Sequence, residues 1–201
     1  MPMPLWSDPM KIKIIEDDEK ALQFEVSGTD NYHVNTLRRA VMNRVKCFAI
    51  DKAMFYENTS AIFDEYIAHR IGLVPISTPQ KGYGEADEVL FTLDASGPGI
   101  VYSKDLVSSD KEVRVANEGI PIIKLAEGQK LRIEGKAVLG NGAKHAKFQP
   151  GFVAFEPIDD TSFKFYIETF GQMSPKEIAY KAIESIKEEV KELKKELKKI
   201  S

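Results

Sequence analysis

The sequence has little cysteine, little excess charge of one sign and no long apolar run. Cys47 is the one cysteine, so a disulfide within these residues is impossible, and a lone thiol suits a reducing compartment. A formal net charge of −3 argues against a strongly basic nucleic-acid surface. No apolar run reaches the roughly 18 residues that suggest a membrane-spanning helix, and the first residues contain no apolar core of a signal peptide. We therefore expect no membrane span and a cytoplasmic location.

Residues with catalytic or metal-binding chemistry are also scarce. The histidines, His33, His69 and His145, are far apart, and none has a second ligand at helical spacing. Cys47 lies in an apolar stretch that is typical of a buried structural thiol. Gly140–Lys144 resembles a phosphate-binding loop only loosely, because it lacks the usual spacing and a following helix. We predict no catalytic, cofactor-binding or metal site.

The apolar pattern predicts a mixture of strands and helices. Alternation over 11–15 and 21–26 predicts an antiparallel hairpin. Steps of three and four then predict a helix of three to four turns with one apolar side, formed by Val34, Leu37, Val41, Val45 and Phe48. A second helix is expected over 61–71, capped by Asn58-Thr59-Ser60. Strands are expected at 47–56, 89–93, 100–102, 119–125, 130–139, 148–155 and 162–170. Because strands and helices do not alternate regularly, the fold class is α+β.

The last segment predicts one long helix with more apolar surface than a small domain needs. Ser174-Pro175-Lys176-Glu177 is a capping-box start. Apolar residues then recur at steps of three and four: Ile183, Ile186, Val190, Leu193, Leu197 and Ile200. Left in water, this stripe would promote aggregation. Either the same chain or a partner must cover it, and the pattern alone does not decide which.

Two groups of basic residues leave alternatives open. The helix over 35–46 carries Arg38, Arg39, Arg44 and Lys46, which could form a nucleic-acid face. No aromatic side chains alternate with them, so a solvated face or a protein interface is favoured. His69 and Arg70 end the second helix; they either cap it or anchor a partner's carboxylate, since arginine binds carboxylates with two hydrogen bonds.

Four segments together resemble a known family. They are Asn35–Val41 (NTLRRAV), Asn58–Ser60 with Asp64–Ile76 (DEYIAHRIGLVPI), Lys144–Pro150 (KHAKFQP) and Glu168–Pro175 (ETFGQMSP). In this order they resemble the α-like subunits of cellular RNA polymerases, in particular the larger archaeal α-like subunit and its eukaryotic counterpart, the third subunit. The resemblance covers nearly the whole chain.

The resemblance implies an architecture and a set of partners. It implies an α-like dimerisation domain formed by 1–50 plus 147–201, with a mainly-β second domain, 51–146, inserted between the two parts. It also implies a heterodimer with the small α-like subunit L. That pair would dock the large polymerase subunits together with the small zinc-binding subunits N and P. The active site of such an enzyme lies in the large subunits, so this chain would be a non-catalytic assembly scaffold without sequence-specific nucleic-acid contacts.

Candidate interface residues follow from the pattern and the resemblance together. They are Leu37, Arg38, Arg39, Val41, His69, Arg70, Ile186, Val190, Leu193, Leu197 and Ile200. We expect the first turns of the last helix, near Ile178 and Ala182, to pack on their own sheet. The part from Val190 to Ile200 is expected to reach the partner. The alternative function is a stand-alone nucleic-acid-binding protein that uses the basic helix over 35–46.

One departure from the family concerns cofactors. Many members carry an iron–sulfur insert after the motif that ends here at Pro150, where this chain has only Glu156–Asp160. Eukaryotic counterparts carry a cysteine-rich zinc loop where this chain has Thr78–Glu88, without cysteine. A cluster needs four thiolates, so we predict neither a cluster nor zinc.

Overall fold

A computed structural model describes residues 9–84 and 86–200. For Ile200 it describes the backbone alone. Contacts divide the described chain into two units. Unit 1 comprises the residues up to Val45 and those from Gln149 onward, and unit 2 comprises Lys46–Phe148. These divisions lie near the expected ones at 50/51 and 146/147.

Unit 1 contains a four-stranded antiparallel sheet in the order β1-β2-β10-β9. Its elements are β1 (Lys11–Asp17), β2 (Ala21–Ser27), α1 (Asn31–Asn43), β9 (Gly151–Asp159), β10 (Ser162–Thr169) and α3 (Pro175–Ile200). The alternation predicted for β2 places Leu22, Phe24 and Val26 on one buried face. Phe24 stacks on Phe165 of β10, with 5.0 Å between ring centroids. β1 and β2 pair antiparallel, so the predicted hairpin is confirmed.

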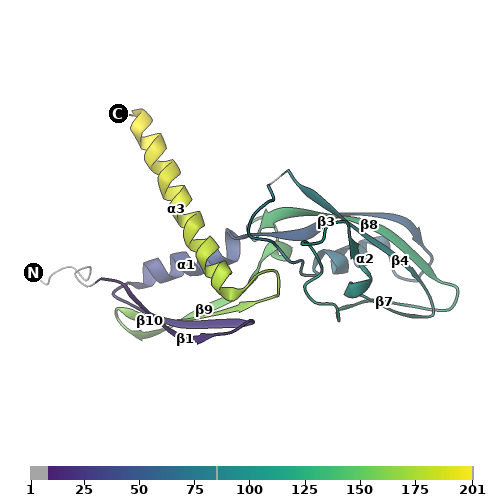
Figure 1. The fold of residues 1–201 in the computed structure, drawn as a ribbon, viewed down its shortest axis with the longest axis horizontal. Helices are drawn as coiled ribbons and strands as arrows, with labels where there is room; N and C mark the ends of the chain where they lie inside the picture. The colour runs from purple at the N-terminus through teal and green to yellow at the C-terminus, as the bar shows by residue number, and fades with distance from the viewer. Residues whose placement is uncertain (1–8, 85, 201) are drawn as a thin grey trace, which may run out of the picture. The chain divides into compact units, whose positions relative to one another are not determined.

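Both helices of unit 1 lie on this buried face (Figure 1). α1 packs against α3 and β9, while α3 also packs against β10 and β2. Val34 and Val41 of α1 are buried, as are Ile178 and Ala182 of α3. The core of unit 1 is therefore a helix layer on one side of a sheet.

The first helix is shorter than its apolar spacing predicted. α1 ends at Asn43, with Arg44 as its C-cap. Val45 follows the helix, and Phe48 lies in β3 (Lys46–Asn58), opposite Leu139 of β8 (Lys130–Asn141). A run of β-branched and aromatic residues favours a strand once a neighbouring strand is available for pairing. The spacing of three and four between apolar residues continues past the end of α1 into β3, although no helix forms there.

The long last helix begins as predicted. Ser174 Oγ accepts a hydrogen bond from the Glu177 amide at 3.3 Å. The Glu177 carboxylate lies 3.3 Å from the Lys181 ammonium, one turn further along. No helix in the described part of the chain, α3 included, is long and apolar enough to cross a membrane.

Unit 2 is mainly β and has its own core. One sheet has the order β3-β8-β4-β6, and a two-stranded ribbon pairs β5 with β7. The further elements are α2 (Asp64–Gly72), β4 (Glu88–Ser96), β5 (Gly99–Tyr102), η1 (Ser103–Asp105), β6 (Val107–Ser108), β7 (Pro121–Leu125), β8 (Lys130–Asn141) and η2 (Ala146–Phe148). α2 packs on β3 and β7, and its Ile67 and Ile71 join Phe48 and Phe91 in the core.

The second helix begins later than predicted. α2 starts at Asp64, and its N-cap residue, Phe63, makes no side-chain capping bond. Asn58 instead organises the preceding turn: its Oδ1 accepts from the Ser60 amide at 3.0 Å, and its Nδ2 donates to the Ile62 carbonyl at 2.9 Å. Asn and Ser side chains commonly stabilise turns in this way. Asn58-Thr59-Ser60 therefore forms the turn that precedes α2 and does not cap the helix as predicted.

Candidate protein interface

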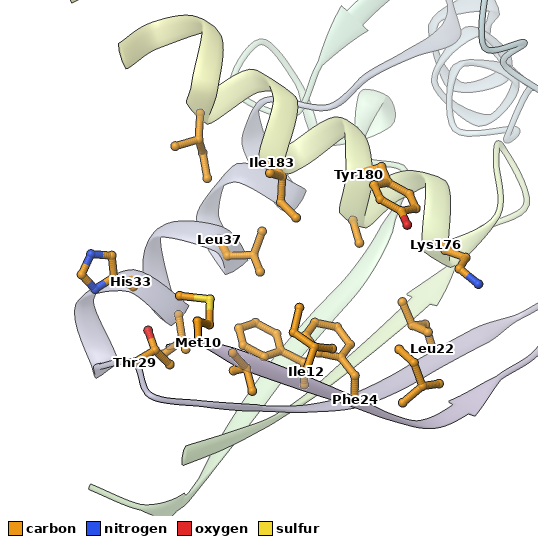
Figure 2. A pocket seen from close by; sticks show the side chains of 16 residues that line it. Met10, Ile12, Leu22, Phe24, Thr29, His33, Leu37, Lys176, Tyr180 and Ile183 are labelled. Carbon is orange, nitrogen blue, oxygen red and sulfur yellow. The ribbon is translucent and has the colours of Figure 1, made fainter. Parts of the chain in front are cut away.

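An apolar groove of about 360 Å³ opens between the sheet and the helices of unit 1. Figure 2 shows Ile12 and Phe24 rising from the sheet, Leu37 reaching in from α1, and Ile183 and Tyr180 projecting from α3. The remaining lining residues are mostly apolar and come from the same elements or from the residues next to them: Met10, Ile14, Leu22, Val26, Thr29, His33, Val34, Phe165, Lys176, Ala179 and Ile186. The groove is open because the helices cover only part of the sheet, and it is hydrophobic because the faces that meet there carry apolar side chains.

β1 forms the uncovered side of this groove. Ile12 pairs with Val26 and Ile14 with Phe24 across the β1–β2 ladder, so these side chains share one face of the sheet. Val26 and Phe24 are 5% and 6% exposed, whereas Ile12 and Ile14 are 60% and 50% exposed. The apolar face thus continues past the edge of the helix layer into solvent.

α3 extends the same apolar surface beyond the sheet. Every described side chain from Lys187 to Lys199 is exposed, and Figure 1 shows this part of the helix leaving the sheet. Val190, Leu193 and Leu197 lie on the stripe that Ile183 and Ile186 begin in the groove. Leu193 and Leu197 are 61% and 58% exposed. We call the groove residues and this stripe together the interface band; its exposed or half-buried apolar members are Met10, Ile12, Ile14, Leu37, Tyr180, Ile183, Ile186, Val190, Leu193 and Leu197.

Some of the predicted interface residues belong to this band, and the others lie elsewhere in unit 1 or in unit 2. Leu37, Ile186, Val190, Leu193 and Leu197 belong to the band. The side chain of Ile200 lies outside the described residues.

Val41 does not belong to the band. Its side chain is 0% exposed within unit 1, so it is part of the core and offers no surface to a partner. It is on the apolar side of α1, as its spacing indicated, but that side faces the unit's own sheet.

The basic residues of the 35–46 segment do not form one open cationic face. Arg38 donates two hydrogen bonds to Asn35 Oδ1, at 3.1 and 3.0 Å. Arg44 forms an ion pair with Glu189 of α3. Arg39 is exposed on α1. Two of the three arginines are therefore engaged within unit 1, which weakens the nucleic-acid alternative.

His69 and Arg70 lie on α2 in unit 2, and neither is a member of the band. Both are exposed, and the Arg70 guanidinium donates to the Pro121 carbonyl. His69 borders a small polar pocket of about 100 Å³ that Asp51 and Lys147 also line. No group of three His, Cys, Asp or Glu side chains that could hold a metal occurs among the described residues.

Asp51 is a charged residue of unit 2 that sequence reasoning missed. Its carboxylate lies 2.8 Å from Lys147 Nζ and 3.2 Å from Lys144 Nζ. The hydrogen bond from Lys147 is the largest cause that holds the pKa of Asp51 below its ordinary value, and Lys144 lowers that pKa further. The two lysines come from the KHAKFQP segment, so long-range pairing, not local spacing, creates this cluster.

The apolar residues of β1 and the start of α3 were also missed as interface residues. The sequence pattern predicts the alternation of β1, but it does not identify Met10, Ile12, Ile14 and Tyr180 as interface residues. Alternation shows which residues share a face of a strand, but it does not show whether that face is covered. A long-range observation, the extent of the helix layer, was needed.

Residues 50–159 match the family described as the RNA polymerase Rpb3/RpoA insert domain. The match runs through most of unit 2 and into β9. It assigns this part of the chain to the class of α-like RNA polymerase subunits, with the mainly-β insert of the predicted α+β fold.

Curated relatives narrow the class. A protein of Thermococcus kodakarensis named DNA-directed RNA polymerase subunit Rpo3 is 47% identical over 153 residues, which are 73% of this chain and 59% of that protein. Proteins of the same name from Pyrococcus furiosus and Methanocaldococcus jannaschii are 45% and 43% identical, with 73% and 76% of this chain and 59% and 78% of their own lengths covered. The chain therefore spans less than two thirds of the first two relatives. It belongs to the archaeal Rpo3 family of DNA-directed RNA polymerase subunits.

Proposed function

We propose that the chain is a non-catalytic assembly subunit of RNA polymerase, and that unit 1 forms a heterodimer with the small α-like subunit L. The observation that supports this pairing is the interface band. Fully burying one Leu, Ile or Val side chain contributes roughly 1.5–3 kcal/mol. The half-exposed stripe residues of α3 alone therefore offer several kcal/mol to a partner that covers them, before the cost of association.

The band also has the apolar composition that is typical of a permanent interface. Permanent interfaces resemble a domain core cut in half and are more apolar than transient ones. Here the band continues directly from the buried core, through Phe24 and Val26 to Ile12 and Ile14. A partner that supplies a complementary helix face would complete the layer over β1. We expect the small α-like subunit to do so.

The heterodimer would then dock the large polymerase subunits, together with the small zinc-binding subunits N and P. For these contacts we propose Arg38 and Arg39 of unit 1 and His69 and Arg70 of unit 2, because arginine and histidine suit polar partner surfaces. The proposal includes a cytoplasmic setting. It assigns no iron–sulfur cluster or zinc to these residues, since Cys47 alone cannot supply a ligand set.

A double substitution on the projecting part of α3 tests the pairing. Leu193→Glu with Leu197→Glu places two charges on the stripe, and both side chains are more than half exposed in the chain by itself. Co-expression with subunit L followed by size-exclusion chromatography should show a heterodimer for the parent chain and none for the double variant. Thermal unfolding by circular dichroism should stay nearly unchanged, because no buried contact is lost.

Lys195→Glu is the matched control. It introduces the same side chain on the opposite side of the helix, so the heterodimer should persist. An unimpaired heterodimer for the double variant would count against the proposal. Tight, salt-dependent binding of nucleic acid by the isolated chain would instead favour the alternative function.

A further inference from the structure

Among the described residues, two ion pairs tie α3 to the rest of unit 1. Near the start of the helix, Lys176 Nζ lies 2.8 Å from Asp17 Oδ2 of β1. Further along, Glu189 forms an ion pair with Arg44. At 1.5 Å per residue, the two ties lie about 20 Å apart along the helix. A stiff helix that is held at two separated points has a defined direction.

Of these two contacts, the one at Glu189 lies nearer the C-terminal end of α3. Beyond it, the described residues Val190–Lys199 are all exposed. An ion pair in this part, Lys199 with Glu196, lies within α3 and so does not orient it. The stripe residues of the interface band beyond Glu189 take their direction from the packing of α1 against α3 and from the Arg44 contact.

Arg44 provides a firm base for this contact. It is the C-cap of α1, and its backbone N–H donates to the Ala40 carbonyl at 2.9 Å. Ala40 and Val45, the residue that follows Arg44, are 0% and 1% exposed. The backbone from which the guanidinium extends is therefore fixed in the core of unit 1.

We propose that Arg44 is a positioning residue: by holding Glu189 it sets the direction in which the outer part of α3 leaves unit 1, so that the interface band meets its partner in one orientation. This inference rests on the proposed heterodimer. Holding a binding element in its bound orientation improves affinity, because less conformational freedom is lost on association.

The exposure of the pair determines the size of the effect. The side chains of Arg44 and Glu189 are 39% and 55% exposed, and an exposed ion pair of this kind changes an equilibrium constant only about two- to fivefold. Removing the charge would therefore be a weak test. Arg44→Glu is sharper, because it replaces attraction with repulsion; we expect an affinity loss of roughly tenfold.

The direction of α3 can be measured in the full chain without a partner. Spin labels on cysteines introduced at Thr36 of α1 and Lys194 of α3, both exposed, report the distance between the two helices by pulsed electron resonance. Cys47 is 0% exposed and should not react with the label. We expect a narrow distance distribution in the parent, a broad one in Arg44→Glu, and a narrow one again when Arg44→Glu is combined with Glu189→Arg.

The affinity of the same unlabelled variants for the small α-like subunit L forms the second measurement. Arg44→Glu should weaken binding about tenfold, and the charge-swapped double variant should recover to within about threefold of the parent. Lys195→Glu makes the same change in net charge on α3 and should bind like the parent. A merely structural role of Arg44 would lower the unfolding temperature without a recovery specific to the swap.

Three results would overturn the inference: an unchanged distance distribution in Arg44→Glu, a broad distribution with unchanged affinity, or no recovery in the swapped variant. If the parent chain itself fails to bind subunit L, the proposed function fails. The distance distributions then decide by themselves whether Arg44 orients α3.

Discussion

At the scale of single residues, the KHAKFQP segment shows how a recognisable motif also serves the fold. Lys147 is only 14% exposed; it pairs with Asp51 and donates to the Ile50 carbonyl at 3.1 Å. Phe148, the aromatic residue of the segment, is fully buried. The ammonium groups of Lys144 and Lys147 each lie 5.2 Å from the centre of its ring. These contacts fasten the segment to β3.

Asp51 should make the stability of the chain depend on pH. Its pKa in the folded chain lies below the ordinary value of 3.8. The carboxylate therefore stabilises the fold fully above that value, and the contribution is lost as the pH falls through the lower folded pKa. We expect Asp51→Asn to lower the free energy of unfolding by about 1 kcal/mol near neutral pH. The difference from the parent should vanish in strong acid, as measured by urea unfolding across the acid range.

Asp160→Asn provides the control for this prediction. Asp160 lies exposed in the turn between β9 and β10, so its substitution should leave the stability nearly unchanged. The parent should still lose stability in acid through other carboxylates whose pKa is lowered chiefly by backbone N–H donors, namely Asp18, Asp30, Asp110 and Asp159. A difference between Asp51→Asn and the parent that persists undiminished in strong acid would contradict the assignment.

At the scale of elements, α1 depends on one side chain for its start. Asp30 Oδ1 accepts a hydrogen bond from the His33 amide at 2.9 Å and lies 2.8 Å from His33 Nδ1. The first amides of a helix lack partners within the helix, so an N-cap acceptor stabilises it. Asp30→Ala should lower the free energy of unfolding by about 1 kcal/mol, as measured by urea unfolding. Asp30→Ser, which keeps an acceptor, should recover most of the loss; equal losses in both variants would contradict the capping role.

α3 is one helix in two environments. Its early residues Ile178 and Ala182 are buried against the sheet, while Leu193 and Leu197 remain exposed. The apolar stripe is equally regular in both parts. The difference arises because the sheet and α1 extend alongside only the first part. Periodicity can identify an apolar face, but the neighbours of that face are set by the tertiary structure.

At the scale of the whole molecule, the two units differ in how completely they bury their apolar surface. The main core cluster, which includes Phe91, Leu93, Leu131 and Ile133, consists entirely of unit 2 residues. Unit 1 has a covered core and the uncovered interface band. Unit 2 therefore has the core of a unit that folds by itself, whereas unit 1 keeps an exposed apolar band, which is the surface that the proposed partner would cover.

Expression of residues 46–148 alone tests this difference. We expect a monomeric fragment with a cooperative urea transition and dispersed amide signals in its nuclear magnetic resonance spectrum, since few of its core contacts are lost. The full chain without a partner serves as the comparison and should bind an apolar fluorescent dye more strongly than the fragment, because it carries the band. A fragment without a cooperative transition would show that unit 2 needs unit 1.

The sequence by itself determined the elements and their class. Alternation identified β1 and β2, and the capping residues and the stripe identified α3, because these signals depend on neighbours within a few positions. The four matching segments identified the family. Local signals were less reliable at element ends: α1 stops before Val45, and α2 starts at Asp64, because strand pairing and turn hydrogen bonds outweighed helical spacing.

Only the tertiary structure decided which apolar faces are covered. It buried Val41 and left Leu193 exposed, although both lie on regular apolar stripes. It brought Ile12 and Ile14 beside the groove, and it joined Arg44 to Glu189 across the length of the chain. Burial depends on what lies opposite a side chain, and for these residues the opposing groups are distant in sequence or, under the proposed function, belong to a partner.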